Sequence, residues 1–390
     1  MKLINLITLS SLIILFQFCF SSFLFGAIDG PAIINNDYKI DLTRGPIIGS
    51  NRKVALGGAY VALAEGAGAL GDNPAGAAIR PPHSNAKWNW DATIGTIKIR
   101  ENDFDNNGSD TFDYSDNRVT NVGVLLQVNR FGLGFYSTPQ DFEIRGLQTT
   151  NQYNFETGYL ALGYQTKNEQ WTWGFGGRFT SMAIDRGESG SQRLIKLSGI
   201  GTHMGLIWNP NMGPFQFGAS FSSKISASQS LVKAGTEPVQ VSGLIVPDEV
   251  ILPAEGSVGF LYSLESAPFW EGHPFLVSMD IKILDKSHQA YGIESFFEQK
   301  VQESGKKITV RYHLGSELEV LKNVLRLRLG TYHEPSRFQG VSSRQHLTGG
   351  FESRLFRFQF FGERYMSFRY AFDVARDYLN HSISFGLWNF

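Results

Sequence analysis

The 390-residue chain has a formal net charge of −1, which gives no electrostatic basis for binding nucleic acid. Beyond its N-terminus it contains no run of 18 apolar residues, which excludes a helical membrane protein. It is rich in Gly (42), Phe (31), Tyr (14) and Trp (7), although only 42% of its residues are hydrophobic. This combination is typical of a transmembrane β-barrel, in which only every second residue of a strand touches lipid.

Residues 1–27 are predicted to be a secretory signal peptide. Met1-Lys2 is followed by an apolar run from Leu3 to about Phe18 and by a small-residue exit at Gly26-Ala27. Cleavage after Ala27 removes the single cysteine, Cys19, so we expect an exported chain without disulfides.

Residues 28–85 are predicted to form an irregular lead-in followed by a plug. The stretch 54–79 consists mostly of Gly and Ala, and its only charges are Glu65 and Asp72. These charges, the glycines and Pro74 disfavour a transmembrane helix. The run Gly66 to Gly71 fits a GxGxxG dinucleotide loop, but a turn follows where that motif needs a helix. Small side chains and glycine corners favour a close-packed hatch of short helices and turns that plugs a barrel.

From about residue 86 to residue 390, the sequence predicts a 14-stranded antiparallel outer-membrane β-barrel. The fourteen predicted strands are 86–99, 118–129, 131–139, 152–166, 170–184, 193–208, 214–229, 253–264, 274–285, 306–318, 322–334, 344–353, 357–373 and 380–390.

The connections between these strands alternate in length. Long ones, such as 230–252 and 286–305, alternate with turns as tight as Asn129-Arg130 and Arg354 to Phe356. Outer-membrane barrels have long external loops and short periplasmic turns. All seven tryptophans fall near the predicted periplasmic ends, where membrane-interface residues belong: Trp88, Trp90, Trp171, Trp173, Trp208, Trp270 and Trp388. We therefore expect a multi-pass barrel in the outer membrane of a Gram-negative-type bacterium.

The alternation of side chains along a strand and the aromatic C-terminus support the prediction of an outer-membrane barrel. Arg326 and Arg328 share one strand face, while Leu325, Leu327 and Leu329 share the other. A mid-membrane arginine facing lipid costs about 2–4 kcal/mol, so the arginines are expected in the lumen. The chain ends with Trp388 and Phe390, a pattern similar to the signal read by the barrel assembly machinery. The predicted partners are therefore outer-membrane lipids and this machinery.

Three groups of residues resemble the FadL family of outer-membrane channels. The first is the stretch from Ala55 to Tyr60, and the second is Glu65-Gly66-Ala67 followed by Asn73-Pro74-Ala75, which together are similar to that family's N-terminal hatch. The third is Arg328 to Tyr332 with Pro335-Ser336, which resembles a late family strand. The resemblance covers the chain from about residue 50 to its end and also implies fourteen strands.

The resemblance implies passive uptake of hydrophobic molecules such as long-chain fatty acids, with lateral release into the membrane through a kink in the third strand. The candidate kink lies between Ser137 and Pro139, because proline cannot donate to a strand ladder; an equally good alternative is that Pro139 only begins a loop. The candidate hatch and gating residues are Gly57, Gly58, Asp72, Asn73, Pro74 and Ala75. Because Pro74 restricts Asn73 to extended backbone, a sharp turn is expected there at the start of a short helix.

The resemblance leaves a second function open. The luminal N-terminal segment of the fatty-acid members has no recognisable equivalent in residues 28–50, and the weakly charged hatch also resembles PorV-type relatives. Those relatives have the same barrel but serve a secretion machine. The alternative is therefore a structural or secretion-associated barrel with a secretion-system partner, in place of a hydrophobic small-molecule ligand or lipid.

Three further candidate sites lie outside the hatch. Leu244, Ile245, Val246, Val250, Ile251 and Leu252 are candidates for an apolar external lip, unless they only extend neighbouring strands. The stretch from Asp103 to Asp110 matches the first half of a calcium loop, but Tyr114 stands at the twelfth position, where an acidic ligand belongs, so a solvated acidic loop is favoured. His381 and Ser382 alternate across a strand and cannot form a nucleophile–base pair. No enzyme activity, cofactor or metal is predicted.

Overall fold

The computed structural model describes residues 28–390 except 82–85, 101–102, 104, 110–113, 145–150, 187–191, 229–238, 242, 361 and 389–390. The predicted signal peptide, residues 1–27, lies outside the described residues, as does Phe390. Within the described part of the chain, none of the helices is long and apolar enough to cross a membrane.

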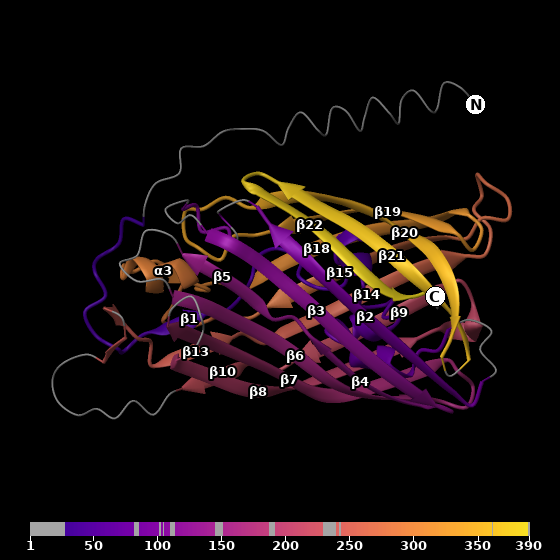
Figure 1. The fold of residues 1–390 in the computed structure, drawn as a ribbon, viewed down its shortest axis with the longest axis horizontal. Coiled ribbons are helices and arrows are strands. Elements are labelled where there is room, and N and C mark those ends of the chain that lie inside the picture. The colour runs from indigo at the N-terminus through magenta and orange to yellow at the C-terminus, as the bar shows by residue number, and fades with distance from the viewer. Residues whose placement is uncertain are drawn as a thin grey trace, which may run out of the picture.

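A closed antiparallel barrel of fourteen strands makes up most of the molecule (Figure 1). Each strand pairs with its sequence neighbours, and the first, β2, also pairs with the last, β22, which closes the ring. The barrel segments are β2 (Trp88–Ile99), β3 (Tyr114–Val128), β4 (Phe131–Ser137), β5 (Gln140–Ile144), β6 (Asn151–Gln165), β7 (Trp171–Arg186), β8 (Gln192–Trp208), β9 (Phe215–Ser222), β14 (Glu255–Leu264), β15 (Phe275–Leu284), β18 (Thr309–Leu321), β19 (Leu325–Glu334), β20 (Arg344–Gln359), β21 (Glu363–Ala375) and β22 (Tyr378–Leu387). The third strand consists of two segments, β4 and β5, which both pair with β3 and β6.

Alternation along each strand separates a lipid face from a luminal face. In β15, Met279, Ile281 and Ile283 are exposed on the outside, whereas Ser278, Asp280 and Lys282 are buried on the inside. The outward band of apolar side chains suits a bilayer, and the inward polar residues suit a lumen. The barrel is therefore a membrane-spanning one of the outer-membrane type.

One predicted hairpin is misplaced. The turn expected from Arg354 to Phe356 lies within β20, which continues to Gln359. Leu355 and Phe356 are exposed, and the pairing with β21 skips a register between Arg354 and Arg357. A β-bulge thus interrupts the alternation here without ending the strand.

A small sheet lies at the long-loop end, on the left of Figure 1. Its strand order is β10-β13-β1-β16-β17. These elements and their neighbours are β1 (Lys39–Asp41), β10 (Ile225–Ser228), β11 (Gln240–Val241), β12 (Leu244–Ile245), β13 (Glu249–Leu252), β16 (Ala290–Tyr291), α3 (Ile293–Glu298) and β17 (Glu303–Ser304). Residues 28–42, 225–228, 244–252 and 290–304 are called the cap below. The cap has its own apolar core, which includes Ile40, Val250, Phe296 and Phe297.

The N-terminal segment runs through the barrel from the long-loop end. At its start, β1 pairs in parallel with β13 and β16, both of which belong to long connections. At its other end, Ile79 accepts a hydrogen bond from Gln127, next to the short turn 129–130. Residues 28–42 therefore lie in the cap, and within this predicted irregular lead-in Lys39–Asp41 form a short strand.

Candidate functional site

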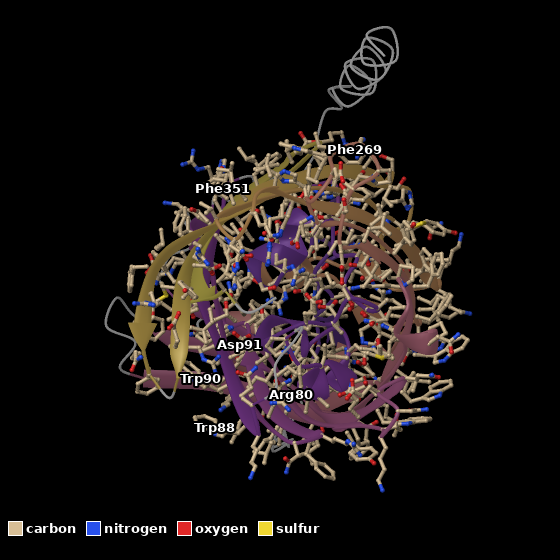
Figure 2. All side chains as sticks on the ribbon, turned by 90° about the vertical axis from the view of Figure 1, so that its right-hand side faces the viewer. Arg80, Trp88, Trp90, Asp91, Phe269 and Phe351 are labelled. Atoms are coloured by element: carbon tan, nitrogen blue, oxygen red, sulfur yellow. The ribbon has the colours of Figure 1, made fainter. Side chains whose placement is uncertain are left out.

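The candidate site is the lumen, which residues 50–79 occupy. We call these residues the luminal segment; it contains α2 (Asn51–Ala55), η1 (Ala67–Ala69) and η2 (Pro74–Ala78). Figure 2 looks along the barrel from the short-turn end and shows this indigo ribbon inside the ring of strands, with Arg80 and Asp91 within the ring and Trp88 outside it. Asp91 of β2 accepts a hydrogen bond from the Ala67 amide at 2.7 Å.

Glycines of the wall allow the backbone of the luminal segment to approach closely. A Cβ added to Gly132, Gly174 or Gly218 would overlap main-chain atoms of Ala77, Ala75 or Val61, respectively. The wall and the segment are therefore complementary in shape at several strands around the barrel. Close approach of two backbones is a common reason for glycine within a strand.

The segment's own Gly57 and Gly58 adopt positive φ, at 61° and 75°. A Cβ on Gly57 would lie 2.7 Å from the Thr331 amide nitrogen, and the Gly57 carbonyl accepts a hydrogen bond from His313 Nδ1 at 2.7 Å. Glycine is needed here both for its conformation and for its contact with the wall.

Asp72 and Asn73 connect the luminal segment to two strands of the wall, β15 and β8. Asp72 forms ion pairs with Lys282 at 2.8 Å and with Lys53 at 3.0 Å. The Asn73 side chain accepts from the Ala75 amide at 3.0 Å and thereby caps η2, which begins with Pro74. The same side chain donates to the Leu206 carbonyl of β8 at 3.2 Å.

Further charged contacts join the luminal segment to β15 and β18, and ion pairs within the wall continue from β18 to β19 and β20. Arg52 pairs with Glu317 through two hydrogen bonds, of 2.9 and 3.0 Å, and Arg328 bridges Glu317 and Glu352. The Asp280 carboxylate accepts from the amides of Tyr60 and Val61 at 2.6 and 2.9 Å. Glu363, in contrast, is exposed and pairs with the exposed Arg357.

Two hollows lie on either side of the luminal segment. The one on its cap side has a volume of about 140 Å³ and reaches Lys53, Gly71 and Asp72. The one at the short-turn end has a volume of about 930 Å³ and reaches Glu65, Ile79 and Arg80. We call the first one the cap-side cavity.

The cap-side cavity combines an excess of positive charge with apolar walls. Its polar lining consists mainly of five cationic side chains and two carboxylates: Arg44, Lys53, Arg178, Lys282, Arg311, Asp72 and Glu255. In the described part of the chain, no carboxylate lies within ion-pair distance of Arg44, Arg178 or Arg311. Leu42, Ile47 and Leu284 line the apolar parts. This chemistry suits an anionic group attached to a hydrophobic body.

The third strand breaks beside this cavity. The strand is interrupted at Thr138-Pro139, directly after Ser137. The Ser137 hydroxyl donates a hydrogen bond to Glu156 at 2.8 Å. Arg44 spans the inner side of the break, donating to Thr157 Oγ1 at 2.9 Å and to Thr138 Oγ1 and Gln140 Oε1 at 3.4 Å. Pro139 thus stands within an interrupted strand rather than at the start of a loop, because β5 resumes the same pairings with β3 and β6.

The six residues proposed as an external lip do not form an exposed patch. Leu244, Val246, Val250 and Ile251 are buried, and Ile245 and Leu252 pack against the same apolar cluster. The structure differs from the expectation because most of these side chains pack into the apolar core of the cap, together with Phe296 and Phe297 of α3.

At the C-terminus, Trp388 stacks under Arg326, whose guanidinium carbon lies 4.1 Å from the ring centre. The main-chain amide of Trp388 donates a hydrogen bond to the Tyr365 carbonyl at 2.9 Å. Trp388 is thus anchored at the short-turn end, where the tryptophan pattern had placed it.

No protein-family model matches the chain, and no curated protein sequence matches it. Solved structures do match. The CymD monoaromatic hydrocarbon channel is 13% identical with a TM-score of 0.53, over 89% of this chain and 96% of that one. A Pseudomonas aeruginosa FadL homologue has the same identity and TM-score over 88% and 98%. The Pseudomonas putida toluene transporter TodX is 11% identical with a TM-score of 0.51, over 92% and 98%. This chain has the FadL-type fold.

Two of the cavity arginines that lack a carboxylate partner among the described residues, Arg44 and Arg178, were not singled out by the sequence. Arg178 continues the inward-facing series of Thr172 and Thr180 in β7, so strand period alone is a signal for it. Arg44 lies in an irregular stretch without period, and only the three-dimensional path of the chain brings it to the third strand.

Proposed function

We propose that this protein is an outer-membrane channel for the passive uptake of hydrophobic small molecules with an acidic head group, such as long-chain fatty acids. The similarity of its fold to channels described for monoaromatic hydrocarbons and toluene supports a hydrophobic substrate. The observation that carries the acidic head group is the cap-side cavity, where three arginines lack a carboxylate partner among the described residues.

The size of this cavity divides the ligand into two parts. A volume of about 140 Å³ accommodates a carboxylate and its first carbons but not a long acyl chain. The head group would accept charge-assisted hydrogen bonds from Arg44, Arg178 and Arg311, and Leu42, Ile47 and Leu284 would contact the adjoining carbons. The rest of the tail needs an apolar path out of the cavity.

We place that path at the break in the third strand. Pro139 offers no N–H to the ladder, so this part of the wall has one hydrogen bond fewer to separate than an unbroken strand. The Thr138 amide and the Pro139 carbonyl still pair with Thr157 and Thr120, respectively. Because Arg44 contacts Thr138, Gln140 and Thr157 around the break, a ligand that recruits Arg44 would weaken those contacts. Capture of the head group would thereby favour lateral release into the membrane, while the luminal segment blocks a straight passage to the periplasm.

Uptake of a fluorescent fatty acid tests this proposal in a bacterial host that lacks its own fatty-acid channel. We expect Arg44→Gln to lower the initial uptake rate by about 10-fold or more, since a hydrogen bond to a charged group contributes about 1.5–3 kcal/mol. Lys167→Gln is the matched control, because Lys167 is exposed in a short turn and the change removes the same charge.

Uptake of toluene distinguishes the head group from the hydrophobic body. Arg44→Gln should leave toluene uptake unchanged if the arginines recognise only an acid. Equal loss of both substrates would contradict the head-group assignment. If the wild type transports neither compound above the level of an empty-vector host, the channel proposal fails and the secretion-associated alternative gains support.

A further inference from the structure

The loop that follows β2 lies in a buried environment beside the cap. Asp103, Asp105 and Asn107 are all at least nine-tenths buried, although an acidic loop was expected to be solvated. Their neighbours come from the cap and from the 335–343 connection: the Gln302 side chain donates to the Asn107 carbonyl at 3.0 Å, and the Ser336 hydroxyl donates to the Asn106 carbonyl at 2.8 Å. Burial of this many polar groups requires that something satisfy them.

The backbone of this loop is folded around the Asp103 carboxylate. The amides of Asn107 and Gly108 donate to its two oxygens at 3.0 and 3.3 Å, and the Ser109 amide donates to Asn107 Oδ1 at 2.7 Å. Gly108 has a φ of 77° at the sixth position of the loop. Calcium loops with ligands at positions 1, 3 and 5 need glycine at this sixth position for the same sharp turn.

Glu294 brings the acidic group that the loop's own twelfth position lacks. It stands in the first turn of α3 and is fully buried. Its Oε2 accepts a hydrogen bond from the Asn107 side chain at 2.6 Å, which places the Glu294 carboxylate beside the fifth position of the loop. Glu294, 187 positions away from Asn107, thus offers the carboxylate that Tyr114, at the twelfth position of the loop, does not.

Asp105 has a buried carboxylate oxygen that makes no hydrogen bond with the described residues, so this oxygen is available to a cation. Its Oδ1 makes no hydrogen bond, while its Oδ2 faces Gly292, directly before α3. Glu294 and Asp103 add negative charge around this buried carboxylate. Among the described residues, Arg344 donates to the Asp103 main-chain oxygen at 2.6 Å and to Glu334 at 3.1 Å, but lies 3.9 Å from the Asp103 carboxylate.

We propose that these side chains bind a calcium ion that fastens Asp103 and residues 105–109 to the cap. The ligands would be the side chains of Asp103, Asp105, Asn107 and Glu294 with the main-chain oxygen of Ser109. Such an all-oxygen set suits Ca²⁺, which takes six to eight oxygen ligands in flexible geometry. No three His, Cys, Asp or Glu side chains of the described residues form a metal-binding group on their own. The amide and main-chain oxygens are therefore essential, and the ion would draw Asp105 and Glu294 together.

Isothermal titration calorimetry tests calcium binding on the full-length protein in detergent, after treatment with a chelator and its removal. We expect one Ca²⁺ per chain with a dissociation constant between about 1 μM and 1 mM, and weaker binding of Mg²⁺. Asp105→Asn and Glu294→Gln should each weaken Ca²⁺ binding by more than about 10-fold, since even outer-shell partners contribute that much. Asp37→Asn is the control, because Asp37 is an exposed carboxylate of the cap.

Thermal unfolding in calcium and in chelator separates an ion from protonated carboxylates. If calcium binds, it raises the melting temperature of the wild type and of Asp37→Asn but not of Asp105→Asn. If the carboxylates are only protonated, Asp105→Asn melts at a higher temperature than the wild type in both buffers, and no Ca²⁺-specific heat is seen. That result overturns the proposal. Neither measurement depends on transport, so its outcome is separate from that of the uptake experiments.

Discussion

The luminal segment and the cap both consist of short elements without long strands, yet they are fixed by different forces. The luminal segment has small side chains, meets wall glycines backbone to backbone, and is held by buried ion pairs such as Asp72–Lys282. The cap instead packs large side chains, including Phe296 and Phe297, against Phe142 and Tyr153 of the strand ends. Contacts of the first kind depend on position to a fraction of an ångström, whereas an apolar core tolerates small shifts.

The largest effect is expected where the wall and the luminal segment meet most closely. A side chain in Gly174→Val would overlap the main chain of Pro74 and Ala75. Even an extra methylene in a packed core costs about 1–3 kcal/mol, and here the obstacle is backbone, so the segment should be displaced. Planar-bilayer recordings should then show a lasting conductance that the wild type lacks.

Gly256→Val provides the matched control for this experiment. Gly256 lies in β14, and a Cβ added there meets nothing within 4 Å. We expect a conductance like that of the wild type. A closed Gly174→Val channel would mean that the luminal segment does not depend on this contact.

A smaller effect on the luminal segment is expected from Asp72→Asn. This change leaves Lys53 and Lys282 buried without their shared carboxylate, and loss of one partner from a buried pair costs about 3–5 kcal/mol. Hydrogen exchange of residues 54–79 should accelerate, while exchange in the cap stays unchanged. Glu363→Gln, which removes an exposed ion pair worth about 0–1 kcal/mol, should alter neither region.

The same contrast explains what the sequence could predict. Period-two alternation and loop lengths were sufficient to locate fourteen strands, because each strand carries its own pattern. The three residues of β1 carry no such pattern, and their partners at Glu249 and Ala290 lie more than 200 positions away. For the same reason, neither the burial of Leu244 to Leu252 nor the position of Glu294 beside Asn107 could be inferred from neighbouring residues.

Removal of divalent cations should affect the cap alone. If calcium is present at 100 times its dissociation constant, its loss costs about 2.7 kcal/mol. Hydrogen exchange in α3 and in residues 105–109 should then accelerate, and exchange in residues 54–79 should not. Faster exchange in both regions would show that the cap and the luminal segment are coupled through residues 43–49 and are not fixed independently.

The smallest effect is expected from Ile40→Val, which tests whether the cap is fixed by its apolar core. Ile40 is fully buried and pairs with Val250 on one side and Tyr291 on the other, so it lies at the centre of the small sheet. Removing one buried methyl group costs about 0.5–1.5 kcal/mol. Exchange in β1 and β13 should accelerate by the corresponding factor of about 2 to 13, whereas Ile34→Val, at a position that is 76% exposed, should have no effect. An unchanged rate in Ile40→Val would mean that hydrogen bonds, or the bound ion proposed above, hold the cap rather than its apolar packing.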